Sequence, residues 1–133
     1  SPPYFRRGTR ALSMTEARLN LGRQGEEIAA RHLEQRGFKI LVRNHRTPIG
    51  ELDIIACDRR HLLFVEVKTR RGTAFGVPAE AVGAHKQRQI VRAARWYLAS
   101  AGDRGLQPRF DVIAVIIGKG DPAISHIPNA FGV

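Results

Sequence analysis

The stretch Gly50–Thr69, which reads GELDIIACDRRHLLFVEVKT, decides the fold. Its two ends, residues 50–57 and 62–69, are rich in β-branched and aliphatic side chains, and the polar segment 58–61 separates them. Two such runs joined by a short polar turn are typical of adjacent antiparallel strands. The sequence therefore predicts a hairpin whose strands carry acidic residues in otherwise apolar surroundings.

The turn predicts which residues of this hairpin face each other. If Asp58 and His61 close it symmetrically, the numbers of paired residues add to 119, which places Asp53 opposite Glu66. The same register places Glu51 opposite Lys68. Side chains alternate along a strand, so these four polar residues share one face. The apolar side chains predicted for the other face are Leu52, Ile54, Val65 and Val67.

Two carboxylates that face each other in a hairpin repel, unless a cation or a shared proton neutralises them. Opposed Cβ atoms lie roughly 4.5 to 5.5 Å apart, close enough for both carboxylates to bind one hard cation. The alternative is a solvated sheet face on which Asp53 and Glu66 pair with arginines. The apolar neighbours of both acids favour a buried pair and hence a functional site.

The sequence around the hairpin completes an α/β domain. A helix ending near Arg36 precedes it, with Ser13 and Glu16 in the pattern of a capping box and Gly37 as the stop. The other predicted elements are a strand at 38–43, a helix at 81–101, a strand at 110–117 and a short edge strand at 123–128. The order α-β-β-β-α-β indicates a mixed central sheet flanked by helices.

Length and charge limit the classes of function. The 133 residues suit one domain, predicted over 14–133, after a flexible basic arm at 1–13. The net charge of +10, with 18 arginines among 22 cations, favours nucleic acid or an anionic membrane as partner and does not choose between them, and arginine can also reflect genome composition. The single cysteine, Cys57, excludes an intrachain disulfide. With no apolar run near 20 residues, we expect a cytoplasmic protein that does not enter membranes.

The acidic residues also carry a resemblance. Asp53, followed after twelve residues by Glu66-Val67-Lys68, resembles the PD-(D/E)xK signature of restriction-endonuclease-like nucleases, with Leu52 in place of the proline. A wider pattern over residues 20–117 resembles the bacterial YraN family of uncharacterised, endonuclease-like proteins. Its segments are Gly22-x-x-Gly25-Glu26-x-x-Ala29, Gly37-Phe38, Gly50-Glu51-Leu52-Asp53 and Phe64-Val65-Glu66-Val67-Lys68-Thr69-Arg70. The helical glutamate beside strand acids is also similar to archaeal-type Holliday junction resolvases.

The resemblance implies a restriction-endonuclease-like core and a catalytic site. Asp53 and Glu66 would bind Mg²⁺ or Mn²⁺, with the Val67 carbonyl as a further ligand, and Lys68 would activate water or stabilise transition-state charge. Glu26 lies near the apolar side of its helix and is the candidate for a third catalytic acid, although a helix N-terminus also favours an acid there. Glu51 is either a supporting acid or an ion-pair partner of Lys68. Asp111 is interpreted as a structural acid or as one that supports the site from behind its ligands, rather than as a ligand itself.

An uninterrupted set of cations follows the second predicted helix. Arg88, Arg92 and Arg95 recur on its polar side beside Trp96, with no acid between residues 81 and 101. This pattern indicates phosphate contacts with an aromatic ring available for stacking, or simply an exposed face of an arginine-rich protein. Arg70, Arg71 and Lys86 follow the Glu66-Val67-Lys68 strand and are predicted to line the entrance of a groove that positions phosphates.

Three hypotheses follow. The first is a metal-dependent endonuclease that hydrolyses DNA, directed by structure or backbone and linked to repair or recombination, with a homodimer where both strands of a junction are cut. The second is a non-catalytic nucleic-acid-binding module with the same fold. The third is an interaction protein whose charge only confers solubility.

Overall fold

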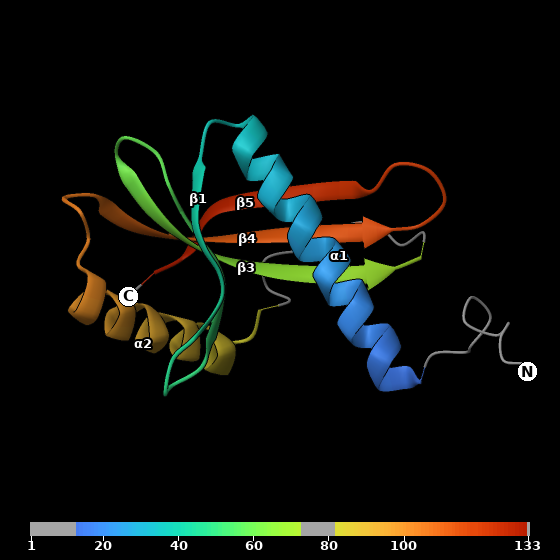
Figure 1. Ribbon diagram of the computed structural model, residues 1–133, viewed down its shortest axis with the longest axis horizontal. Coiled ribbons are helices and arrows are strands. Elements are labelled where there is room, and N and C mark those ends of the chain that lie inside the picture. Colours follow the sequence, from blue (N-terminus) through green and yellow to red (C-terminus); the bar gives the residue numbers. More distant parts are fainter. Residues whose placement is uncertain (1–12, 73–81, 133) are drawn as a thin grey trace, which may run out of the picture.

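The fold is a five-stranded sheet with one helix on each face (Figure 1). The computed structural model describes residues 13–72 and 82–132. The elements are α1 (Met14–Gln35), β1 (Lys39–Arg46), β2 (Glu51–Cys57), β3 (His61–Arg71), α2 (Ala84–Ala101), β4 (Gln107–Ile117) and β5 (Ala123–Phe131). This order confirms the predicted α-β-β-β-α-β arrangement with an added edge strand.

The strands lie in the sheet in chain order, from β1 to β5. Strands β1, β2 and β3 form an antiparallel meander, β3 pairs parallel with β4, and β5 returns antiparallel to β4. A parallel pair needs a long crossover between its strands, and α2 lies in that connection. The sheet is therefore mixed, as the sequence predicted.

Two apolar clusters fix the layers. On one face, Ala29 and Leu33 of α1 pack with residues such as Ile54, Val65 and Ile113. On the other face, α2 packs on the sheet, and the residues that α2 contributes are Ile90, Val91, Ala93, Ala94 and Tyr97. The spacing of Ala29 and Leu33 along α1, and of Ile90, Val91, Ala94 and Tyr97 along α2, predicts one apolar side for each helix, and these are the sides that the helices bury.

Helix α1 has the predicted ends. Ser13 Oγ accepts a hydrogen bond from the Glu16 N–H at 3.0 Å, and Glu16 Oε1 accepts one from the Ser13 N–H at 3.0 Å. The helix ends at Gln35, before Gly37 at φ +91°. Ser13 therefore caps the helix, whereas residues 1–12 of the predicted arm and Ala81 of the second predicted helix lie outside the described residues.

The hairpin register is confirmed where the structure pairs the strands. Ile54 faces Val65 and Cys57 faces Leu62, as the turn predicted. The prediction that Leu52 shares the face of Ile54 is wrong, because Leu52 packs with the α2 cluster and Ile54 with the α1 cluster.

The change of face at Leu52 has its cause in the neighbouring strand, β1. Asn44, between the pairs Arg43 with Ile54 and His45 with Leu52, has a left-handed φ of 52°. As a result Arg43 reaches Glu27 of α1, while His45 contacts the Tyr97 ring of α2. The β1–β2 hairpin therefore twists at this point, and the side chains beside Asp53 no longer alternate regularly between the two faces of the sheet.

Candidate active site

Asp53 and Glu66 meet on the α2 side of the sheet. Asp53 lies on β2 and Glu66 on β3, and their carboxyl groups share a hydrogen bond. Asp53 Oδ2 also accepts a hydrogen bond from the Val67 N–H at 2.9 Å. Glu66 is 7% exposed and Asp53 is partly buried, so the two acidic side chains are held together with little access to water.

Burial dominates the protonation of this pair. Burial, followed by the charge of Asp53, raises the pKa of Glu66 to about 8, although Lys86 and Lys68 counteract part of the rise. Burial also raises the pKa of Asp53, against the lowering effects of the Val67 N–H, Glu66 and Lys86. The pair therefore retains a proton at a pH where isolated carboxyl groups are ionised.

Two lysines face the acidic pair from different elements. Lys86, in the first turn of α2, places Nζ 4.0 Å from Glu66 Oε2. Lys68 lies two residues after Glu66 on β3 and is close enough to lower its pKa. The cations are near the pair but do not saturate it with hydrogen bonds, because 4.0 Å exceeds hydrogen-bond distance.

Glu26 reaches this centre from α1. Burial and then the charge of Asp53 raise its pKa, while a hydrogen bond with Asn44 lowers it. Glu27, one position on, turns to solvent and pairs with Arg31 at 3.0 Å and Arg43 at 2.9 Å. The structure thus brings Glu26 toward the acidic pair and directs Glu27 away from it.

Gly25 explains how α1 comes so close to the sheet. A Cβ atom at this position would collide with the side chain of Thr69 on β3. Glycine allows the helix and strand backbones to approach, and it directly precedes Glu26 in the helix. The spacing Gly25-Glu26 therefore has a physical role in placing the third acid.

Glu51 contacts a different residue from the one predicted. Its Oε2 lies 3.5 Å from Arg46 Nε, across the β1–β2 pair, rather than facing Lys68. The described β2–β3 pairs end at Ile54 with Val65, so the symmetric register does not continue to Glu51. Glu51 remains near the centre, since its charge contributes to the raised pKa values of Glu26 and Asp53.

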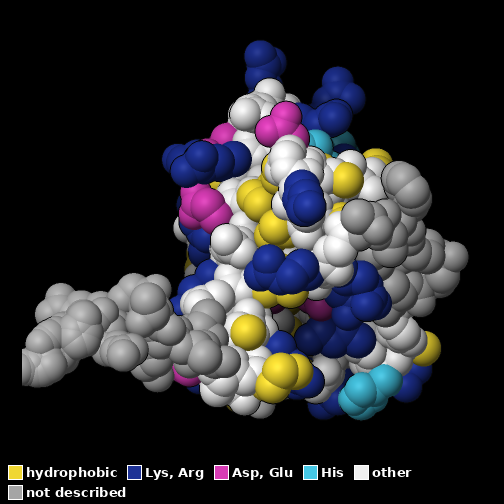
Figure 2. All heavy atoms as spheres, turned by 90° about the vertical axis from the view of Figure 1, so that its right-hand side faces the viewer, with side chains coloured by type: hydrophobic (Ala, Val, Ile, Leu, Met, Phe, Trp, Pro, Cys, Tyr) yellow, Lys and Arg dark blue, Asp and Glu magenta, His cyan; other side chains and the backbone are white. Residues whose placement is uncertain are grey.

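The predicted phosphate-binding residues divide into two places. Arg70 and Arg71 are exposed at the end of β3, and Arg88, Arg92 and Arg95 are exposed along α2. The α2 arginines border a hollow of about 390 Å³ next to Gly132. Trp96, 39% exposed, lies beside His45 with their ring centroids 6.5 Å apart. Figure 2 views the molecule from the right-hand side of Figure 1. On this face, Lys and Arg side chains surround a hollow in which an acidic side chain is partly visible.

Two features were missed by sequence reasoning. Asn44 was not singled out, because a left-handed residue within a strand leaves no periodic signal, although Asn tolerates that conformation more readily than most residues. His126 was also missed: its Nε2 lies 2.8 Å from Asp111 Oδ2, and its Nδ1 lies 3.1 Å from His32 Nε2. These contacts support the interpretation of Asp111 as structural.

The donor atoms suit a hard divalent cation. Asp53, Glu66 and a backbone carbonyl such as that of Val67 offer only oxygen, and Mg²⁺ is commonly held by one or two carboxylates with water and substrate filling the remaining positions. A cation would also offset the burial that raises both pKa values and the repulsion from Asp53 that adds to the rise at Glu66. Among residues 13–72 and 82–132, no three His, Cys, Asp or Glu side chains are grouped closely enough to form a metal cage by themselves.

Fold and site together define an α/β domain with a buried acidic pair flanked by lysines. Comparison with known proteins matches residues 25–115 to the model of the Uncharacterised protein family UPF0102. The chain belongs to this family, which confirms the YraN resemblance.

Its relatives match over nearly their whole length. A UPF0102 protein of Syntrophotalea carbinolica is 61% identical over 120 residues, covering 90% of this chain and 98% of the relative. One from Geobacter sulfurreducens is 50% identical over 112 residues, covering 84% and 88%. One from Desulfosudis oleivorans is 48% identical over 118 residues, covering 89% and 94%. Neither described helix is long and apolar enough to cross a membrane.

Proposed function

We propose that this protein is a metal-dependent nuclease that hydrolyses phosphodiester bonds in DNA, directed by backbone and structure and serving repair or recombination. The observation that carries the proposal is the buried Asp53–Glu66 pair beside Lys68 and Lys86. Buried carboxylates that are poorly neutralised by their own protein are expected to have a functional reason. A divalent cation and a phosphate would supply the missing partners.

Each residue has a separate task in this proposal. Asp53 and Glu66 would hold Mg²⁺ or Mn²⁺, with the Val67 carbonyl as a further donor. The metal, when bound, would polarise the phosphate and lower the pKa of a bound water. Lys68 orients that water or stabilises the negative charge that develops on the phosphate, and Lys86 keeps Glu66 in position. Glu26 supports the centre from α1.

The charged surface supports nucleic acid as the substrate. Arg88, Arg92 and Arg95 are exposed on the side of α2 turned away from Lys86, so they offer phosphate contacts on the surface beyond the acidic pair. Contacts of this kind hold phosphates and do not read bases. The proposal is therefore one of backbone-directed cleavage.

The test is cleavage of single-stranded, duplex, flap and four-way-junction DNA with Mg²⁺ or Mn²⁺. Glu66→Gln and Lys68→Ala should each lower the rate by about 100-fold or more while binding is retained. Glu34→Gln, an exposed glutamate on α1, is the matched control and should cleave like the wild type. Full activity in a clean Glu66→Gln preparation, or no cleavage by the wild type under any condition, would overturn the proposal.

One observation favours a second function, a binding module without catalysis. The described residues provide two carboxylates close together rather than a cage of three metal-binding side chains. Such a module would bind DNA without cutting it, and Arg92→Ala should weaken binding to all sequences and reduce the salt dependence by about one phosphate. Cleavage that depends on Glu66 would exclude this alternative.

A further inference from the structure

A second pocket adjoins the acidic centre on the side away from α2. It lies between the first half of α1 and the β1–β2 hairpin and has a volume of about 330 Å³. Glu26 and Glu51 belong to its lining, and both acids are close enough to Asp53 to affect protonation at the centre. The pocket therefore opens beside the site proposed for cleavage and contains no residue of α2.

The pocket is lined by three kinds of side chain: cationic, acidic or polar, and apolar. Arg18, Arg23 and Arg46 supply cations, and the Arg46 side chain is 90% exposed even though it pairs with Glu51. Glu26, Asn44 and Glu51 supply polar groups next to the acidic centre. Leu19, 54% exposed, supplies an apolar surface beside Gly22.

This combination matches a nucleotide better than a bare phosphate. Guanidinium groups bind phosphate, an exposed apolar side chain packs against a base, and carboxylates or an amide accept hydrogen bonds from base amino groups. A phosphate alone would contact only the arginines and would make no favourable contact with the carboxylates or with Leu19. A volume of about 330 Å³ lies within the range of small-molecule pockets.

A base that fills this pocket cannot at the same time remain paired and stacked in a duplex. A paired and stacked base must leave the helix before it can enter a pocket in a protein. We propose that this pocket receives an unpaired nucleotide next to the cleaved phosphate, so the substrates are single-stranded or branched DNA. The inference rests on the proposed nuclease function and specifies its substrate class.

Gly22 provides a sharp test, because a Cβ atom built there meets no atom within 4 Å. Gly22→Phe places a ring at the pocket without a collision at Cβ, and Gly22→Ala is the matched control at the same helix position. Binding is measured by fluorescence anisotropy in EDTA, with an oligonucleotide of about 12 bases used single-stranded and as a duplex. Gly22→Phe should weaken single-strand binding about 10-fold and change duplex binding less than about two-fold.

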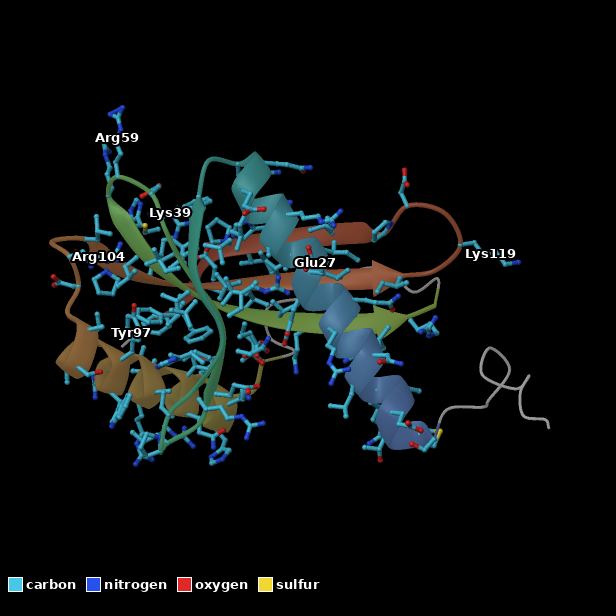
Figure 3. The ribbon with its side chains drawn as sticks, in the orientation of Figure 1. Glu27, Lys39, Arg59, Tyr97, Arg104 and Lys119 are labelled. Carbon is cyan, nitrogen blue, oxygen red and sulfur yellow. The ribbon has the colours of Figure 1, made fainter. Side chains whose placement is uncertain are left out.

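A second variant guards against misfolding. Arg18→Ala combined with Arg23→Ala should produce the same selective loss, whereas Arg59→Ala should not. Arg59 lies in the β2–β3 turn, and Figure 3 shows it projecting outward far from α1's first turns. Circular dichroism and urea unfolding establish that each variant is folded before binding is compared.

The outcomes separate this inference from the proposed function. Equal losses of single-strand and duplex binding, or wild-type affinity in both Gly22→Phe and the double arginine variant, overturn the pocket assignment. Wild-type cleavage of continuous duplex as fast as of single strands also overturns it and leaves the nuclease proposal intact. A wild type that binds unpaired DNA selectively in EDTA, but cuts none of the substrates with metal, supports the pocket and overturns the nuclease.

Discussion

Two buried acidic centres lie on opposite faces of the same sheet, and they differ in how well the protein neutralises them. Asp111 of β4 is fully buried and accepts two hydrogen bonds from Arg109, at 2.9 and 2.8 Å. His126 Nε2 lies 2.8 Å away, and the Asn129 N–H donates at 3.0 Å. The Asp53–Glu66 pair has one backbone donor, its own shared hydrogen bond and a lysine at 4.0 Å.

The pKa values follow from this difference. Burial alone would raise the pKa of Asp111, but hydrogen bonds from His126, Arg109 and the Asn129 N–H outweigh it and lower the pKa to about 2. Burial raises the pKa of Glu66 to about 8, because Asp53 adds repulsion and the lysines only partly compensate. Asp111 thus stabilises the fold, whereas the Asp53–Glu66 pair costs stability that a bound ligand could recover.

The largest expected effect is that of Asp111→Asn. The change removes the charge that pairs with Arg109 and leaves a guanidinium with only 19% exposure of its side chain. We expect a loss of about 3 to 5 kcal/mol in the free energy of unfolding, measured by urea denaturation at pH 7. Asp121→Asn, in the exposed β4–β5 turn, is the control and should change stability by less than about 0.5 kcal/mol.

The same variant has a defined pH dependence. The pKa of Asp111 is about 2 in the folded protein and 3.8 as its ordinary value, so its stabilisation is present above about pH 4 and lost as pH falls toward 2. The difference between wild type and Asp111→Asn should therefore shrink on acidification. A difference that stays constant from pH 7 to pH 2 would show that the carboxylate charge is not its source.

The second expected effect is a gain in stability, in Glu66→Gln. The pKa of Glu66 rises from 4.5 to about 8 on folding, so wild-type stability falls as pH rises through this window. Glu66→Gln removes that penalty and should increase the free energy of unfolding by about 1 to 3 kcal/mol at pH 8, with no gain below pH 4.

Thermal and urea unfolding at the two pH values check this change, without added metal. The expected gain coincides with the loss of cleavage predicted for the same substitution, which is the pattern of a residue retained for function at a cost in stability. A Glu66→Gln protein that is less stable than the wild type at pH 8 would place Glu66 with Asp111 among structural acids.

Local patterns predicted most of the sheet. The polar turn at 58–61 set the register of Ile54 with Val65, because a short hairpin leaves few alternatives once both strands are apolar. Apolar periodicity also identified both helices and the buried side of α2. The predicted acids Asp53 and Glu66 meet because they lie close to that well-defined turn.

The missed features depend on contacts distant in sequence or on a single backbone angle. Leu52 changes face because Asn44, in another strand, adopts a left-handed φ. The partner of Glu51 changes with it, from Lys68 to Arg46. His126 lies 15 residues from Asp111, on an edge strand that extends to Phe131 and beyond its predicted end at 128, so no local pattern links the two.

The smallest of the three effects tests what neutralises Asp111. Arg109→Lys keeps the charge but loses the paired hydrogen bonds and the guanidinium that lies 5.7 Å from the centre of the Phe38 ring. We expect a loss of about 1 to 2 kcal/mol in the free energy of unfolding, measured in urea, since a lysine binds as a point charge and cannot form the two-pronged contact.

Arg59→Lys, on the exposed turn, is the control and should leave the free energy of unfolding unchanged. If Arg109→Lys is neutral as well, charge alone satisfies a buried acid in this sheet, and the nearby lysines would then be expected to satisfy Glu66. A clear loss would show that directed hydrogen bonds, which Asp111 has and Glu66 lacks, separate the two centres.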